Sequence, residues 1–181
     1  MARTLAERMI GAAMLDVSVY EEVEADESAT GQAALVVAIV AIAGAVGAWG
    51  DGGSGMTSAV VSEFLKWFIW AGLTWFIGTR FFGGTATYGE LLRTLAFAMS
   101  PGVLLVLGFV PILGWLVGAA VAIWSLVAGV IAIRQALDFD TGKAVATALI
   151  GWGIMMAVVM TFAMVAFGAV MFGAALGGLA G

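Results

Sequence analysis

The stretch from Tyr88 to Ile133 constrains the fold of this chain more than any other, because it is almost entirely apolar and contains both prolines, Pro101 and Pro111. A charged turn opens it, and no further charged residue follows until Arg134. An apolar run of this length cannot face water and is long enough for two membrane-spanning helices. Proline removes a backbone donor and disfavours helix just before it. We therefore predict two spans with a tight turn at Pro111, the first of them kinked at Pro101.

The composition of the whole chain indicates the same class of protein. Of its 181 residues, 63% are hydrophobic and 10% are charged, whereas soluble domains carry roughly 25% charged residues. The chain has neither Cys nor His, which excludes disulfides, Cys/His zinc sites and the usual catalytic triads. The net charge of −5 argues against a nucleic-acid partner, which would need a basic face. We expect no cofactor and no metal.

The N-terminal region, residues 1–31, is predicted to lie in the cytoplasm and to begin with an amphipathic helix. In residues 2–15, Leu5, Met9 and Ala13 recur at helical spacing, and polar residues fall on the other side. A short helix of this kind either lies in the membrane interface or packs against the ends of the spans.

Residues 16–31 form a predicted acidic linker. It is interpreted either as a solvated connector or as a docking surface for a basic partner, such as another membrane protein, or for divalent cations, which favour oxygen ligands. Its carboxylate spacing does not match an EF-hand loop. The candidate docking residues are Glu21, Glu22, Glu24, Asp26 and Glu27.

The remainder, residues 32–181, is predicted to be the membrane domain of an all-α integral membrane protein. Long apolar runs separated by polar or glycine-rich turns indicate a bundle of five transmembrane helices. The last apolar run is expected to be helical to about Phe172, followed by a frayed or loosely packed Gly/Ala tail. The predicted spans are about 33–49, 59–82, 88–109, 111–133 and 144–172.

The distribution of Lys and Arg predicts the orientation of these spans. If the N-terminus is cytoplasmic, nearly all the basic residues fall on cytoplasmic segments or span ends, as the positive-inside rule requires. Lys66 alone lies toward the outer side, and the C-terminus is predicted to be outside. The cytoplasmic set is Arg3, Arg8, Arg80, Arg93, Arg134 and Lys143.

The second predicted span contains two charged residues, Glu63 and Lys66. An ionisable residue within a span is costly and is a functional candidate by default. At a spacing of three residues the two side chains share a helix face and can pair. They are interpreted either as a salt bridge near the outer interface, with snorkelling side chains, or as part of a polar cavity for an ion, a proton or a lipid headgroup.

Charged residues at the other ends of the spans predict a ring at the cytoplasmic surface. This ring serves either to anchor the protein to anionic lipid headgroups or to bind a partner together with the acidic linker. The residues are Arg80, Glu90, Arg93, Arg134, Asp138, Asp140 and Lys143.

The triplet Ser100, Pro101 and Gly102 is the predicted helix break in the third span. Pro101 frees a carbonyl near Phe97, which Ser100 could satisfy, and in lipid such a break requires neighbours that restore the hydrogen bonding. The break is either a packing kink or a hinge of the kind seen in transporters.

Small residues four apart, Gly114 with Gly118 and Gly173 with Gly177, predict close helix packing, either within the chain or between copies of it.

Several short segments together resemble the Yip family, membrane proteins named for their interaction with Ypt/Rab GTPases, and in particular its prokaryotic members. The segments are TYGELLR at the start of the third span, SPG within it, the PILG turn, WSL in the fourth span and RQALDFDTGKA before the fifth. The resemblance extends over about residues 5–172. It implies a cytoplasmic N-terminus, a five-span bundle, no enzymatic activity and residence in a prokaryotic cell membrane. For eukaryotic members it implies membrane trafficking with small GTPases.

Three functional classes remain at this point, of which an intramembrane enzyme is the least favoured, because no span contains a convincing pair of catalytic carboxylates or a Ser/Lys dyad. The resemblance and the acidic segment favour a structural or adaptor protein in membrane organisation or trafficking, with lipids, another membrane protein or a second copy as partners. The intramembrane pair Glu63 and Lys66 and the break at Pro101 favour a small transporter, channel or lipid-moving protein.

Overall fold

The computed structural model describes residues 3–48, 55–110 and 112–179, with side chains up to residue 172. Every regular element within these residues is helical, so the chain is an all-α protein. In chain order the helices are α1 (Leu5–Ala13), α2 (Val17–Ala25), η1 (Glu27–Ala29), α3 (Thr30–Gly47), α4 (Met56–Phe81), α5 (Tyr88–Ala98), η2 (Ser100–Phe109), α6 (Leu113–Ala136) and α7 (Thr141–Leu179).

Four helical segments are long and apolar enough to cross a membrane: Glu27–Gly47, Met56–Phe81, Leu113–Ala136 and Thr141–Phe172. The pair of α5 and η2 makes a fifth span if the two are counted as one bent span. The described residues therefore form an integral membrane protein with four or five crossings, as the hydropathy of the sequence predicts. Pro111 lies outside the described residues, and so does the turn expected there.

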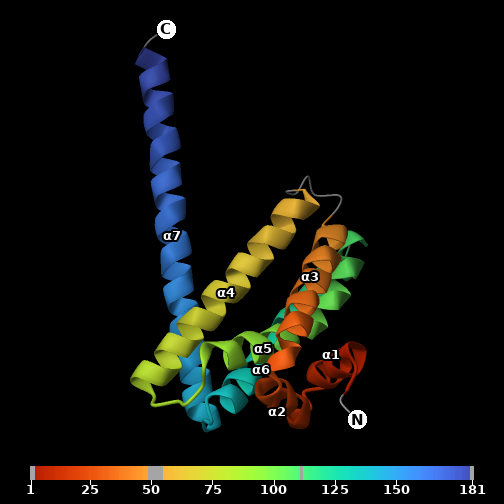
Figure 1. Ribbon diagram of the computed structural model, residues 1–181. Helices are drawn as coiled ribbons and strands as arrows, with labels where there is room; N and C mark the ends of the chain where they lie inside the picture. The colour runs from red at the N-terminus through yellow and green to blue at the C-terminus, as the bar shows by residue number, and fades with distance from the viewer. Residues whose placement is uncertain (1–2, 49–54, 111, 180–181) are drawn as a thin grey trace.

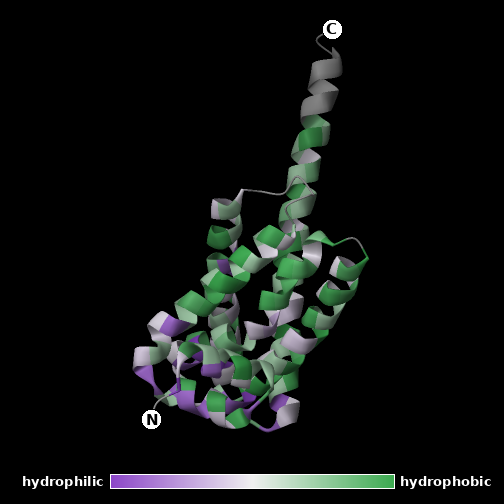
Figure 2. Cartoon of the chain, turned by 90° about the vertical axis from the view of Figure 1, so that its right-hand side faces the viewer, coloured by the Kyte–Doolittle hydropathy of each residue, from purple (hydrophilic) through white to green (hydrophobic). Residues whose placement is uncertain are grey.

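The hydrophilic residues gather at the end of the molecule that carries the N-terminus (Figure 2). Figure 1 shows α1, α2, the connection from α4 to α5 and the turn from α6 to α7 at this end, with the far end of α7 on the opposite side. We call it the charged end. The long helices that lead away from it are predominantly apolar, which is the distribution that a bilayer solvent selects.

The third span is broken where the sequence predicts, at Ser100 and Pro101. Helix α5 ends at Ala98, and the chain continues as the 3₁₀ helix η2 at an angle of 41°. The hydroxyl of Ser100 donates to the carbonyl of Phe97 at 2.6 Å, and the amide of Gly102 donates to the carbonyl of Met99 at 2.8 Å. The first bond satisfies the carbonyl that the missing proline amide leaves open in lipid, and the second continues the chain as a 3₁₀ helix.

Helix η2 packs directly along α3, backbone against backbone. A Cβ atom added at Gly102 would lie 2.6 Å from Cγ1 of Val40 in α3. A Cβ atom added at Gly108 would lie 3.0 Å from the carbonyl oxygen of Gly47. Only glycine permits this approach, which explains why a glycine-rich segment follows the proline.

The acidic segment departs from its interpretation as a solvated connector, because residues 17–25 form helix α2. Asp16 caps its start by accepting from the amide of Ser18 at 3.0 Å. Val19, Tyr20 and Val23 are buried on the inner face of α2. The apolar positions at helical spacing within this acidic stretch decide the outcome, since burying them outweighs the solvation of the intervening carboxylates.

Helix α1 begins with a capping box between Thr4 and Glu7. Its inner face packs against α2, where the Tyr20 hydroxyl donates to the carbonyl of Ala12 at 2.9 Å. Its last turn meets α6, where Trp124 Nε1 donates to the carbonyl of Ala13 at 2.7 Å. The two N-terminal helices are therefore docked on the membrane bundle.

The Gly/Ala tail also differs from its expected frayed state, since α7 remains helical to Leu179. The segment after Thr141 contains no proline and no charged residue beyond Lys143. Without a proline, no residue in this segment removes a backbone donor or forces a break in the helix.

Candidate functional site

Arg8 is the centre of a polar network that joins α1 to α2. The sequence pattern places it on the polar side of α1, but its side chain is only 2% exposed. Its guanidinium donates to Glu22 at 2.8 Å, to Asp26 at 2.6 Å and to Gln32 at 2.9 Å. Arg3 donates to the second carboxylate oxygen of Glu22 at 2.6 Å. A charge buried to this degree is tolerated because two carboxylates pair with it and all three guanidinium nitrogens donate hydrogen bonds.

These contacts shift the pKa values of both carboxylates. Burial acts to raise the pKa of Glu22, but the hydrogen bonds from Arg8 and Arg3 outweigh it and hold that pKa below its usual value. The pKa of Asp26 is lowered by its hydrogen bonds with Ser28 and Arg8. Two of the five predicted docking residues therefore bind arginines of their own chain, in place of a basic partner.

Arg93 binds the C-terminal end of α2 from the membrane bundle. It is 5% exposed, and its Nε donates to the carbonyl of Val23 at 2.8 Å, while Nη2 donates to the carbonyl of Glu24. The last carbonyls of a helix lack partners within the helix and carry its negative dipole end, so a guanidinium there is favourable. Arg93 is thus an internal helix cap and does not join a surface ring with Glu90.

Glu24 lies half-buried beside this cap, among other acids. Burial raises the pKa of its carboxyl to about 7, with further increases from Glu90, Asp138 and Glu21 and an opposing effect of Arg93. Glu24 therefore changes its protonation near neutral pH. Within the part of the chain that the structure describes, no group of three or more carboxylates is arranged to hold a metal ion.

The other predicted ring residues lie at the charged end but make local contacts. Asp138 accepts from Thr85 at 2.9 Å, and Asp140 caps the start of α7 by accepting from the Lys143 amide at 3.0 Å. Arg134 is half-buried and donates through Nε to Gln135 at 3.0 Å. Arg80 is exposed near the end of α4.

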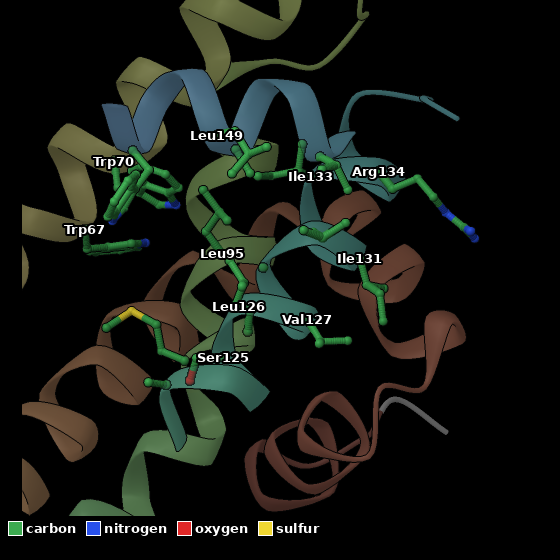
Figure 3. Close-up of a pocket in the computed structure, with 18 of the residues that line it drawn as sticks. Trp67, Trp70, Leu95, Ser125, Leu126, Val127, Ile131, Ile133, Arg134 and Leu149 are labelled. Carbon is green, nitrogen blue, oxygen red and sulfur yellow. The ribbon is translucent and has the colours of Figure 1, made fainter. Parts of the chain in front are cut away.

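Glu63 and Lys66 form an ion pair on α4, with the Lys66 side chain 63% exposed. Both line a groove of about 1010 Å³ between α4, α5, α6 and α7, which we call the apolar groove. Its walls are almost entirely apolar, with Trp67, Trp70 and Leu149 on one side (Figure 3). A volume of this size lies at the upper end of the range of about 300–1,000 Å³ typical of ligand pockets.

The helix break and the groove share residues. Ala98, the last residue of α5, and Met99, which follows it, both line the groove. On α6 the lining continues through Ser125 and Leu126 to Arg134, whose guanidinium points away from the groove (Figure 3). The break therefore shapes one wall of the apolar groove by ending α5 there.

A comparison with protein-family models matches residues 16–163 to the Yip1 domain. The match extends over well more than half of the chain, from just before α2 through the break to just past the middle of α7. The chain belongs to the Yip1 domain family. No curated protein and no solved structure matches it.

In this Yip1 domain the Arg93 cap, the helix break and the apolar groove all fall within the matched residues, whereas α1 and Arg8 precede them. Sequence reasoning missed the roles of Arg8 and Arg93. A signal for Arg8 was available, since Glu22 and Asp26 are one helical turn apart and can face a single cation. No local pattern could have indicated the apolar groove, because four helices form it.

Proposed function

We propose that this member of the Yip1 domain family is a non-enzymatic structural or adaptor protein of a prokaryotic cell membrane, which presents a rigid cytoplasmic platform to a partner. The observation that carries the proposal is the docking of α1 and α2 on the bundle through Arg8, Arg93 and Trp124. A platform fixed in this way displays its outer side chains in one arrangement, which lowers the entropy cost of binding.

The platform favours a basic partner. Glu21, Glu27, Asp138 and Asp140 are exposed on it, while Glu22 and Asp26 hold it together from inside. The sequence-based set of docking residues is thereby divided into an outer group that faces solvent and an inner group that faces Arg8. Complementary charge of this kind speeds association and selects partners more than it raises affinity.

The test neutralises only the outer group, as Glu21→Gln, Glu27→Gln and Asp138→Asn in one variant. We expect reversible cross-linking in membranes followed by quantitative mass spectrometry to show the loss of basic partners. The matched control is Glu63→Gln, which removes a carboxylate far from the charged end and should leave those partners in place. If every cross-linked partner survived the triple substitution, the platform would lose its assigned role.

The outer half of α7 favours a second copy of this chain as a further partner. A helix of 39 residues is about 58 Å long, whereas the hydrocarbon core is about 30 Å thick. Beyond Met156 its described side chains are exposed and, apart from Thr161, apolar. A second copy packed along α7 would cover this surface.

A second candidate function is the binding or movement of a lipid or ion at Glu63 and Lys66. The observation that favours it is the apolar groove, which both residues line. Because the pair is already neutralised by its own salt bridge, the groove is better suited to an apolar or amphipathic ligand than to a free ion.

A further inference from the structure

We infer that the apolar groove is a binding site for a glycerophospholipid of the leaflet at the charged end, with one acyl chain along the groove and the phosphate beside Arg134. This inference rests on the second candidate function and names the ligand of the same groove. It is independent of the adaptor platform, whose exposed acids lie on α2, on η1 and in the turn between α6 and α7.

The length of the groove matches one leaflet. On α6 the lining extends from Ala122 to Arg134, and on α7 from Thr141 to Trp152. At 1.5 Å per residue these segments advance about 18 Å and about 16 Å. Half of a hydrocarbon core of about 30 Å is about 15 Å, so the groove extends from the charged end to about the middle of the bilayer.

The same length argues against a helix of a second copy as the occupant. A transmembrane helix runs through the whole hydrocarbon core and needs a contact surface about twice as long as this groove. It would also have to pass the ion pair of Glu63 and Lys66 on α4. An acyl chain that enters from one leaflet needs only the length that the groove offers, and it would end beside the ion pair without having to pass it.

The walls of the groove leave room for a chain. A Cβ atom added at Gly129 on α6 would meet no atom within 4 Å, although Gly129 lines the groove. The neighbouring positions Ala122 and Ala148 are also small. Leu126 and Leu149 supply apolar contact on the two sides (Figure 3). Small residues on the helix surface therefore keep the space open between larger apolar side chains.

Arg134 is placed for the phosphate. It stands where the groove reaches the charged end, and its guanidinium is directed out of the groove (Figure 3). Among the residues that the structure describes, its guanidinium donates only through Nε, to Gln135. No carboxylate in the described ranges lies within ion-pairing distance of it. A guanidinium in this position can bind a phosphate in the plane of the headgroups.

The experiment uses the full chain in vesicles of equal parts phosphatidylglycerol and phosphatidylcholine. A trace of either lipid carries a diazirine in one acyl chain, and the labelled residues are mapped by mass spectrometry after illumination. We expect the adducts to concentrate on four groove residues: Leu126, Val130, Val145 and Leu149. The adduct yield there should exceed the yield on the exposed residues Phe68 and Ile69 of α4 by at least about fivefold. A ratio of this size requires only modest binding, since each 1.4 kcal/mol of binding free energy changes the occupancy tenfold.

Two glycines of α6 provide a matched pair of variants. Gly129→Leu fills the groove and should reduce groove adducts by about fivefold. Gly118→Leu adds the same side chain at a position that also has no atom within 4 Å and does not line the groove, so it should change the yield of groove adducts little.

Arg134→Gln should reduce the preference for the phosphatidylglycerol probe over the phosphatidylcholine probe by about fivefold. This factor corresponds to the binding free energy that one arginine contributes at an anionic membrane surface.

Adducts spread evenly over α4, α6 and α7, and unchanged by Gly129→Leu, would overturn the inference, because the groove would then hold only bulk lipid. Cross-links within the groove to α7 of a second copy would overturn it as well. Lipid movement between leaflets is measured in a separate assay. If the probe labels the groove but no lipid movement is observed, the transport function is rejected and the binding site is retained.

Discussion

At the scale of single residues, two arginines determine where the N-terminal helices lie. Arg8 reaches from α1 to the acidic face of α2, and Arg93 reaches from α5 to the open carbonyls at the end of α2. Arg8 replaces water around carboxylates, and Arg93 replaces water around backbone carbonyls. Such polar groups would cost free energy if they were buried without a hydrogen-bond partner. Glu24 is the exception in this region, because three other carboxylates face it and the guanidinium of Arg93 is directed to its carbonyl.

We predict that the docking of α2 weakens as the pH rises through about 7. The folded-state pKa of Glu24 is raised from 4.5 to about 7, so its contribution to stability is fully present below pH 4.5 and is lost as the pH rises through the folded pKa. The effect should be about 1 kcal/mol, because the half-exposed carboxyl is screened by solvent. Hydrogen exchange of the α2 amides at pH 5.5 and 8, corrected for intrinsic rates, measures it.

Glu24→Gln should abolish this pH dependence, whereas Glu27→Gln, on the exposed side of the same segment, should retain it. An equal pH response in the wild type and in Glu24→Gln would refute the assignment. The pKa values of Glu22 and Asp26 are lowered, so their contribution has the opposite sign. It is present above their unfolded pKa values and is lost when the pH falls below about 4.

At the scale of elements, the third span depends on a close contact that only glycines allow. The proline ends α5, and the resulting 3₁₀ helix is longer than the runs of three or four residues usual for this conformation. The stability of η2 then comes from its packing on α3. The close contact is formed by Gly47 of α3 and by Gly102 and Gly108 of η2. The break and the glycines therefore form one structural unit.

Gly47→Ala is predicted to lower the free energy of unfolding in detergent by about 1–3 kcal/mol, the usual cost of overpacking a tight contact. The new methyl would meet the backbone carbonyl of Leu105, which cannot move aside as a side chain could. Gly44→Ala, one turn earlier in α3, would come only within 4.0 Å of a Leu105 methyl group, and alanine is the better helix former. It should be neutral or stabilising, and a similar loss in both variants would contradict this packing.

At the scale of the whole molecule, the charges separate the two sides of the membrane. The described Lys and Arg residues other than Lys66 lie at the charged end, together with the N-terminus. The positive-inside rule therefore predicts that this end is cytoplasmic. A cytoplasmic charged end would place the platform, Glu24 and Arg134 in the same compartment.

The absence of Cys from the chain permits a direct measurement of this orientation. Thr85→Cys places a thiol at the charged end, and Ser58→Cys places one at the start of α4. A maleimide that does not cross membranes should label the Ser58→Cys variant in intact cells, and the Thr85→Cys variant only after the membrane is opened. The reverse pattern would invert the predicted topology.

Much of the fold could be predicted because it depends on local properties. Apolar runs of about 20 residues define the spans, and the proline at 101 defines the break. The ion pair of Glu63 and Lys66 follows from their spacing of three residues on one helix. These features require only the sequence near each residue, since in a lipid solvent the backbone must satisfy its own hydrogen bonds within each helix.

The sequence by itself determined that this is an all-helical membrane protein with a broken third span, because hydropathy and proline act over a single helix. Only the tertiary structure decided that the acidic segment is a docked helix, that Arg8 and Arg93 are internal, and that four helices enclose the apolar groove. The partners in these contacts lie far apart along the chain, 70 residues for Arg93 with Val23 and 111 residues for Trp124 with Ala13. Whether a charge faces solvent or another helix is set by that distant packing, which no local pattern records.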